Sequence, residues 1–356
     1  MMNIFEEMEK YGHEELVFWY DKTTGLKAIV GIHDTTLGPA LGGCRMWHYQ
    51  SEDEAITDVL RLSRGMSYKN AAMGLDLGGG KSVLWADSRH DKSEALLRSF
   101  GRLVQSLGGR YITAEDVGTN ADDMAIVSRE TKFVGGLKET SGDPSPATAL
   151  GVLVGMKAAA ALVWGTPALA GKRVAIQGMG HVGSILAGML KDDGARLVVT
   201  DIEAEEGQAK AQSLGADWVD ADAIYGVEAD IFAPCALGAV LNDETIPQLK
   251  CRVVAGSANN QLKEARHGDE LVRRNIVYVP DYVINGGGVV NVADEFHRDG
   301  YHQERATARV RQIGRQVTEI LERSQRERVS SQESADHVAE QRMHVLGRIR
   351  SNYIPE

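Results

Sequence analysis

The sequence predicts an α/β protein of two domains, in which a doubly wound sheet of the Rossmann type follows an N-terminal α/β domain. Its 356 residues exceed the length of one typical domain. In the second half, short apolar runs alternate with helix-length segments, as parallel strands and their crossover helices do. A glycine-rich loop directly follows the first of these runs, where such folds turn from strand to helix. The expected domain boundaries are residues 1–140 and 141–331.

The first domain is expected to alternate strands and helices. Two apolar runs, Leu16–Tyr20 and Leu26–His33, flank a polar turn and predict a β-hairpin. Ser51 is followed three residues later by Glu54, a capping-box pattern that predicts the start of a helix. The other elements expected in this domain are strands at 83–85 and 111–113 and a helix at 94–107.

A segment rich in turn-forming residues, 135–146, predicts a linker or hinge between the two halves. An alanine-rich helix is expected directly after it, because apolar residues then recur at helical spacing. The elements expected beyond the linker are helices at about 147–163, 304–328 and 335–346, and strands at 174–177, 197–200, 231–233, 253–255 and 276–279.

Composition and charge exclude several classes of protein. The net charge of −11 argues against a nucleic-acid-binding role, because phosphate neutralisation needs a basic face. Three scattered cysteines and no closely paired histidines predict neither a disulfide framework nor a metal site. The acidic N-terminus lacks a signal sequence, and the apolar stretch Gly151–Trp164 is too short to span a bilayer. We therefore expect a cytoplasmic protein that contacts neither membrane nor nucleic acid.

The glycine-rich loop indicates a dinucleotide site. The segment 174–183 is an apolar strand that runs into G-x-G-x-x-G, in which Gly178 permits the turn, Gly180 admits a pyrophosphate and Gly183 allows the helix to pack. Asp201 ends the next strand at about the 20-residue spacing expected of a ribose-binding acid. Its carboxylate would repel a 2′-phosphate, which favours NAD over NADP.

A second glycine-rich segment surrounds Lys81. Leu77–Ser82 misses the phosphate-binding P-loop template, because Leu75 stands where that template needs glycine. Three glycines before Lys81 would instead form the floor of a cleft that a substrate approaches closely. A desolvated lysine beside a second cation, such as Lys69, would have a lowered pKa and could act as a base. The alternative is a surface lysine after a flexible turn.

Several motifs together resemble the glutamate/leucine/phenylalanine/valine dehydrogenase family of amino-acid dehydrogenases, and within it the branch that acts on leucine. The similarity covers nearly the whole chain, and the Gly-Gly-Gly-Lys and Glu-Asp-Val-Gly-Thr motifs are specific to this family. Small departures occur, such as Cys44, Ala239 and Gly286 where the family usually has Thr, Gly and Ala. The matching segments are Ile32–Gly43, Gly65–Ala72, Leu77–Lys81, Arg110–Thr119, Asp230–Gly238 and Pro280–Asn285.

The resemblance implies the NAD-dependent, reversible oxidative deamination of L-leucine and other branched-chain L-amino acids to 2-oxo acids and ammonia. It implies a substrate-binding and oligomerisation domain before the NAD-binding domain, and a last helix, over about 332–356, that returns to the first domain. A homo-oligomer is also implied, with an octamer favoured and a dimer as the alternative. Phenylalanine, valine and tryptophan dehydrogenases remain alternatives, as do a 2-hydroxy-acid dehydrogenase and a non-catalytic NAD-binding regulator.

Site residues follow from the same resemblance. Lys69 would bind the substrate carboxylate, Lys81 would be the general base, and Asp116 would exchange protons with the amino group. Lys69 could instead only complement a helix dipole, and Glu115 is expected to be structural. The other substrate-binding residues implied are Gly42, Gly43 and Asn260, and the implied cofactor-binding residues are Thr148, Gly178, Met179, Gly180, His181, Val182, Gly183, Ser184, Asp201, Cys235, Ala236 and Asn260. For Thr148, capping of a helix N-terminus is the alternative.

The resemblance also implies an aliphatic side-chain pocket. Leu41, Ala114, Val289 and Val292 would line it without any charge or hydrogen-bond donor, so a charged substrate side chain would be buried unpaired. The compact valines and the methyl of Ala114 favour leucine, isoleucine and valine over phenylalanine. The two valines could instead be simple core residues.

Overall fold

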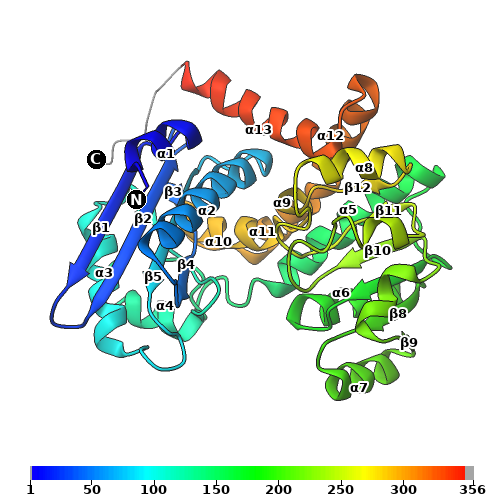
Figure 1. Ribbon diagram of the computed structural model, residues 1–356, viewed down its shortest axis with the longest axis horizontal. Coiled ribbons are helices and arrows are strands. Elements are labelled where there is room, and N and C mark those ends of the chain that lie inside the picture. The colour runs from blue at the N-terminus through cyan, green and yellow to red at the C-terminus, as the bar shows by residue number, and fades with distance from the viewer. Residues whose placement is uncertain (1, 349–356) are drawn as a thin grey trace. The chain divides into compact units, whose positions relative to one another are not determined.

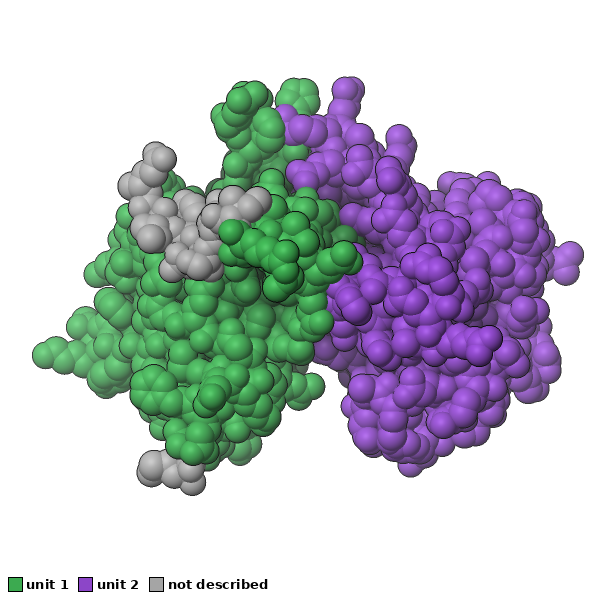
Figure 2. All heavy atoms as spheres, turned by 90° about the horizontal axis from the view of Figure 1, so that it is seen from above, with its two compact units in different colours: residues 1–143, 292–302, 339–356 green, residues 144–291, 303–338 purple. Residues whose placement is uncertain are grey.

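The structure, a computed structural model that describes residues 2–348, divides the chain into two units (Figures 1 and 2). Unit 1 comprises Met1–Asp143, Val292–His302 and Ala339–Glu356, and unit 2 comprises Pro144–Asn291 and Gln303–Val338. The first division lies within the segment expected to be a linker. The chain passes between the units four times, so neither unit is one continuous stretch of sequence.

Two assignments differ from the expected boundaries. Residues 292–302 were assigned to the second domain, but they belong to unit 1, where the Glu295 carboxylate accepts hydrogen bonds from the Gly136 and Ser141 backbone nitrogens. The last helix was assigned wholly to the first domain, but its start belongs to unit 2, because the Ser331 hydroxyl donates to the Tyr278 carbonyl there. Residues 349–356 of that expected helix lie outside the described residues.

Unit 1 is built on a mixed sheet of order β1-β2-β5-β3-β6, with β4 also paired to β5. β1 and β2 form the expected antiparallel hairpin, and β5 continues the sheet antiparallel to β2. β3 and β4 both run parallel to β5. The strands are β1 (Glu15–Asp21), β2 (Leu26–Asp34), β3 (Ala40–Leu41), β4 (Cys44–Trp47), β5 (Gly78–Trp85) and β6 (Tyr111–Ile112), and the helices are α1 (Ile4–Tyr11), α2 (Glu52–Ala72), α3 (Glu94–Ser106) and α4 (Ala121–Val127).

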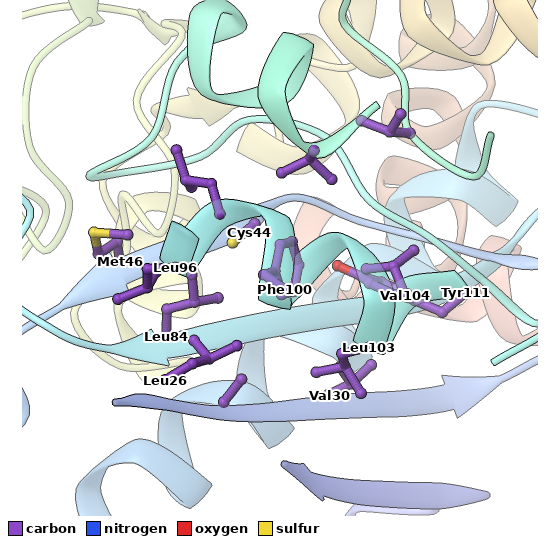
Figure 3. Close-up of a cluster of buried hydrophobic side chains, with 14 of the residues drawn as sticks. Leu26, Val30, Cys44, Met46, Leu84, Leu96, Phe100, Leu103, Val104 and Tyr111 are labelled. Atoms are coloured by element: carbon purple, nitrogen blue, oxygen red, sulfur yellow. The ribbon is translucent and has the colours of Figure 1, made fainter. Parts of the chain in front are cut away.

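Helices cover both faces of this sheet, because successive strand residues point to opposite sides. In β2, Val30 belongs to the apolar cluster of α3, whereas Ile29 packs with α2. Figure 3 shows the α3 side chains, with Phe100 at their centre, packed over the sheet. Ser51 caps α2 as expected, although the Glu54 carboxylate accepts from the Gln50 nitrogen and not from that of Ser51.

Unit 2 contains the expected doubly wound parallel sheet, and the Rossmann-type fold is confirmed. The strand order is β12-β11-β10-β7-β8-β9, and every neighbouring pair is parallel. The order reverses direction between β7 and β10, which is the switch point where such sheets bind ligands. The strands are β7 (Arg173–Gln177), β8 (Arg196–Thr200), β9 (Asp217–Trp218), β10 (Ile231–Pro234), β11 (Val253–Val254) and β12 (Val277–Tyr278).

The helices of unit 2 lie along both sides of its sheet, and two further helices cross the unit boundary (Figure 1). The single helix expected over 304–328 is two helices, because a turn interrupts it at Gln312, whose nitrogen bonds to the Arg309 carbonyl. The helices of unit 2 are α5 (Ser145–Trp164), α6 (His181–Asp192), α7 (Ala204–Leu214), α8 (Arg266–Arg273), α9 (Asp281–Ile284), α11 (Gln303–Arg311) and α12 (Ile313–Glu327), and the two crossing helices are α10 (Gly287–Ala293) and α13 (Ser331–Gly347).

Helix α5 is the one described helix that is long and apolar enough to cross a membrane by length and composition. It begins six residues before the expected apolar stretch and runs for 20 residues, so the argument from insufficient length does not hold. In the structure it packs against α6, α11 and α12, as a core helix of unit 2 does.

Candidate active site

Lys81 lies inside β5 and is buried, with 5% of its surface exposed. The alternative of a surface lysine after a flexible turn is therefore wrong. Its neighbour along the same face of the strand, Val83, packs with α2, so Lys81 projects toward the α2 side of the sheet. Burying an ammonium group requires a partner of opposite charge.

Asp116 is that partner. Its Oδ1 lies 3.0 Å from Lys81 Nζ, and its Oδ2 accepts a hydrogen bond of 2.9 Å from Arg45 Nε. Burial raises the pKa of Asp116, but the charges of Lys81 and Arg45 outweigh burial and lower the pKa to about 2. The carboxylate is therefore ionised at neutral pH and forms an ion pair with Lys81.

The glycines before Lys81 do not form an open cleft floor, contrary to our expectation. A Cβ at Gly79 would overlap the backbone and hydroxyl of Ser67 on α2, and a Cβ at Gly80 would overlap the Tyr111 ring. Gly78 is filled in the same way by the Asp34 carbonyl. These glycines therefore allow α2 and neighbouring strands to approach β5 closely, which positions Lys81.

Gly42 and Gly43 have the same effect at the start of β4. A Cβ at Gly42 would overlap the Gly80 carbonyl, and one at Gly43 would overlap the Glu115 carbonyl and crowd Asp116. The Gly42 nitrogen also donates to the Ile112 carbonyl, so that N–H has a partner within the protein. Close chain packing thus explains both glycines without a ligand.

Two buried histidines lie on the α2 side of the sheet. His33 Nδ1 lies 2.8 Å from Ser67 Oγ, and His13 Nε2 lies 2.7 Å from Ser63 Oγ. Burial lowers the pKa of His33 to about 4, and burial with the neighbouring His33 lowers that of His13 to about 3. Both rings are therefore neutral at neutral pH. His33, in β2, and His13, in the segment before β1, both contact α2, the helix that carries Lys69.

The remaining residues expected at the substrate site differ in burial. Lys69 lies half-buried in the last turn of α2, where a cation also complements the helix dipole. Leu41 is 1% and Val292 is 7% exposed, whereas Ala114 and Val289 are half-buried. Within unit 1, Lys81 thus contacts Asp116. Leu41 lies in β3, which pairs with β5, the strand that carries Lys81.

The predicted dinucleotide loop of unit 2 has the geometry that a pyrophosphate needs. Gly178 has φ of 99°, a left-handed conformation that favours glycine. A Cβ at Gly183 would overlap the Gly178 carbonyl, so α6 packs directly on the loop. A Cβ at Gly180 would meet nothing within 4 Å, which leaves room for a phosphate at the start of α6.

The other predicted cofactor residues surround this loop. Asp201 Oδ2 accepts a hydrogen bond of 2.6 Å from the Met179 nitrogen, which fixes the carboxylate beside the loop. Ser184 Oγ donates to the Met179 carbonyl. Ala236 lies against Gly178, and Cys235 lies against Gly183. His181 and Val182 form the first turn of α6.

Thr148 lies near the start of α5, and Asn260 has a positive φ. The Thr148 hydroxyl donates to the Pro144 carbonyl, and Pro144 rather than Thr148 is the N-cap of α5, so the capping alternative is wrong. Asn260 is exposed and has φ of 52°, a left-handed conformation that asparagine adopts more readily than most residues. Burial raises the pKa of the Cys235 thiol, which makes it a poor nucleophile.

Sequence reasoning missed three members of the charged cluster: Arg45, Asp58 and Tyr49. Arg45 Nη1 lies 3.1 Å from Asp58 Oδ2, and the Tyr49 hydroxyl donates to the same oxygen at 2.7 Å. One signal was available, because Arg45 is the only charged residue among the apolar residues of Cys44–Trp47.

A possible metal-binding group lies elsewhere in unit 2, where ligand atoms of Asp243, Glu264 and His267 come within 4.8 Å of one another. The Arg266 guanidinium pairs with both carboxylates, at 2.6 Å and 2.9 Å. His267 Nδ1 already contacts the Glu264 backbone, at 3.0 Å from its nitrogen and 3.1 Å from its carbonyl oxygen. The group is therefore explained by ion pairing.

Comparison with known proteins agrees with this architecture. Residues 14–133 match the family model described as "Glu/Leu/Phe/Val dehydrogenase, dimerisation domain". Residues 140–207 and 199–347 match the model of the glutamate/leucine/phenylalanine/valine dehydrogenases. The chain belongs to this family. It is therefore an amino-acid dehydrogenase, and a nicotinamide cofactor is typical of such enzymes.

Individual relatives are similar over almost their whole length. Leucine dehydrogenase of Bacillus cereus is 56% identical over 99% of this chain and 97% of its own. Phenylalanine dehydrogenase of Bacillus thermotolerans is 47% identical over 97% of this chain and 91% of its own. The crystal structure of L-tryptophan dehydrogenase from Nostoc punctiforme superposes with a TM-score of 0.85 at 42% identity, covering 97% of this chain and all of that one.

Proposed function

We propose that this amino-acid dehydrogenase catalyses the NAD-dependent, reversible oxidative deamination of L-leucine and other branched-chain L-amino acids. The observation that carries the chemistry is the ion pair between buried Lys81 and half-buried Asp116, whose Nζ and Oδ1 atoms lie 3.0 Å apart. The similarity to leucine dehydrogenases, higher than to the phenylalanine and tryptophan enzymes given above, supports the branched-chain substrate.

The proposed roles follow from charge and position. Lys69 pairs with the substrate carboxylate through charge-assisted hydrogen bonds. Lys81, as the neutral amine, accepts a proton from the water that attacks the oxidised substrate, and Asp116 exchanges a proton with the substrate nitrogen, which leaves as ammonia. Asn260 orients the reacting groups. Bound NAD supplies the hydride acceptor for the substrate Cα.

The residues of unit 2 fit NAD. The open space at Gly180 and the free end of α6 suit the pyrophosphate, and the Asp201 carboxylate at the end of β8 suits the ribose hydroxyls. The same carboxylate would repel a 2′-phosphate. The cofactor contacts proposed at Thr148, Cys235 and Ala236 complete this set.

The proposed side-chain pocket is aliphatic and carries no charged partner. Leu41, Ala114, Val289 and Val292 would exclude a charged substrate side chain but would discriminate weakly among aliphatic ones, by about 1–3 kcal/mol per methylene. We therefore expect L-isoleucine and L-valine to react as well.

We further propose a cytoplasmic homo-oligomer that assembles through unit 1. β1 is an edge strand of its sheet, and Phe18 and Tyr20 on it are 44% and 66% exposed. Exposed aromatic side chains on an unpaired strand edge favour association. Size-exclusion chromatography with light scattering would distinguish the octamer from the dimer.

Initial rates with L-Leu, L-Ile, L-Val, L-Phe and L-Trp, each with NAD and with NADP, test the proposal. We expect the highest kcat/KM for L-leucine with NAD. A kcat/KM for L-phenylalanine above that for L-leucine would move the enzyme to the phenylalanine branch. Absence of NADH formation with every amino acid would favour the non-catalytic regulator.

A further inference from the structure

Arg45 and Lys81 contact different carboxylate oxygens of Asp116. Lys81 Nζ contacts Oδ1 at 3.0 Å, and Arg45 Nε contacts Oδ2 at 2.9 Å. β4 pairs with β5 so that Arg45 lies opposite Val83, and the two side chains project from the same face of the sheet as Lys81. The Asp116 carboxylate is therefore gripped between two cations from neighbouring strands.

Arg45 is itself held in place by α2. Its Nη1 bonds to the Asp58 carboxylate, which also accepts the Tyr49 hydroxyl. The Arg45 side chain is 23% exposed, so its guanidinium is fixed in one geometry by these partners. A continuous chain of contacts thus runs from Tyr49 through Asp58, Arg45 and Asp116 to Lys81.

We propose that Arg45 is a positioning residue, which fixes the rotamer of Asp116 so that Oδ1 faces Lys81 and supplies the second positive charge beside the carboxylate. The inference rests on the proposed function, because Lys81 and Asp116 have their catalytic roles only there. A guanidinium suits this position better than an ammonium, because its planar fork bonds two carboxylates at once.

The charges around Asp116 determine how the loss of Arg45 changes the pH dependence of the rate. Lys81 faces it from β5 and Arg45 from β4, whereas the nearby Cys44 thiol and Tyr111 phenol are neutral because burial raises the pKa of each. Without Arg45, Asp116 keeps one cation, and the uncompensated Asp58 carboxylate remains near. The Lys81–Asp116 pair as a whole then holds its proton more tightly, so a step in which Lys81 must be the neutral amine loses rate at a higher pH than in the wild type.

The test compares kcat and KM for L-leucine across the pH range of activity in R45Q, R45K and D58N. For R45Q we expect kcat to fall about tenfold or more, with KM little changed because Arg45 does not contact substrate. The acid limb, which is the fall in kcat on the acid side of the pH profile, should also lie at a higher pH than in the wild type. R45K should restore the acid limb but only part of kcat. D58N should shift kcat in the same direction by less.

The matched control is R98Q. Arg98 also bonds two carboxylates of unit 1, those of Glu94 and Glu130, at 2.9 Å and 2.7 Å, but it lies on α3 on the other face of the sheet. Its kcat and pH profile should equal those of the wild type. If R45Q fails to fold by circular dichroism, R45K and D58N decide the question.

A wild-type acid limb in R45Q, or a loss of kcat with an unshifted limb that R45K does not restore, would overturn the proposal. A fall in kcat together with the shifted limb, absent from R98Q, would establish it. A wild-type enzyme without amino-acid dehydrogenase activity would overturn the proposed function itself. An active wild type with a normal R45Q would overturn only the role of Arg45.

Discussion

Buried Lys81 is the residue on which the proposed chemistry depends. Its ion-pair partner is Asp116, and both residues belong to unit 1, whereas the dinucleotide loop belongs to unit 2. In the proposed mechanism, proton transfer and cofactor binding are therefore carried by residues of different units. A change at Lys81 should therefore separate turnover from cofactor affinity.

We expect Lys81→Ala to lower kcat by about two to four orders of magnitude, the usual effect of removing a proton-transfer group. The dissociation constant of NADH, measured by fluorescence titration, should stay near the wild-type value. The control is Lys92→Ala, which removes another ion-paired lysine of unit 1, 2.7 Å from Asp123. Wild-type turnover in Lys81→Ala would exclude Lys81 from the mechanism.

Asp201 determines the cofactor preference in our proposal. We expect Asp201→Ser combined with Ile202→Arg to raise the ratio of kcat/KM for NADP to that for NAD by about tenfold or more, because a repelling carboxylate is replaced beside a new cation. Ile202 is 83% exposed, so the arginine can be accommodated. Ile202→Arg alone is the control, since it keeps the carboxylate. An unchanged ratio in the double variant would contradict the assignment.

At the scale of the elements, the loop after β10 contains a strained position. Ala239 has φ of 59°, a left-handed conformation that costs a residue with a Cβ roughly 1–2 kcal/mol. It is exposed to solvent. The loop follows the strand that lies at the switch point of the sheet.

We expect Ala239→Gly to raise the free energy of unfolding by up to about 1 kcal/mol, because relief of strain exceeds the added entropy of the unfolded chain. Thermal unfolding measures the change. The control is Ala168→Gly, at an exposed loop position without a positive φ, which should lower stability by about 0.5–1 kcal/mol. Equal losses in both variants would contradict the argument.

How far the sequence predicts each element depends on whether the determining contact is local. The dinucleotide loop, its strand and Asp201 follow from one continuous pattern, and the structure has them as expected. Gly79 was misinterpreted because the atoms that fill its missing side chain belong to α2. Arg45 was missed because its partners, Asp58 and Asp116, lie 13 and 71 residues away.

At the scale of the whole molecule, the buried histidines of unit 1 link stability to pH. Histidine in an unfolded chain titrates near pH 6.5, whereas the pKa of His33 is about 4 and that of His13 about 3 in the folded protein. As the pH falls below about 6.5, these two histidines become protonated in the unfolded chain but stay neutral in the folded protein. The free energy of unfolding therefore falls by roughly 1.4 kcal/mol per pH unit for each histidine until about pH 4.

We expect His33→Gln to make the free energy of unfolding depend less on pH, by the amount that uptake of about one proton contributes. The pH dependence of the urea midpoint between about pH 6.5 and 4 measures this change. The exposed His48→Gln serves as the control. A wild-type midpoint that does not change with pH across this window would show that the two rings titrate normally in the folded protein.

The repeated passage of the chain between the units also sets an order on its biosynthesis. The Glu340 carboxylate accepts the Tyr68 hydroxyl at 2.7 Å, and Arg342 Nη2 lies 2.7 Å from Asp76 Oδ1, so unit 1 is fastened by a segment that follows unit 2 in the sequence. During translation, the sheet of unit 1 emerges from the ribosome long before residues 292–302 and 339–348. Unit 1 therefore stays incompletely covered until the Rossmann-type unit has been synthesised. Chaperones can bind the first half of the nascent chain during this interval.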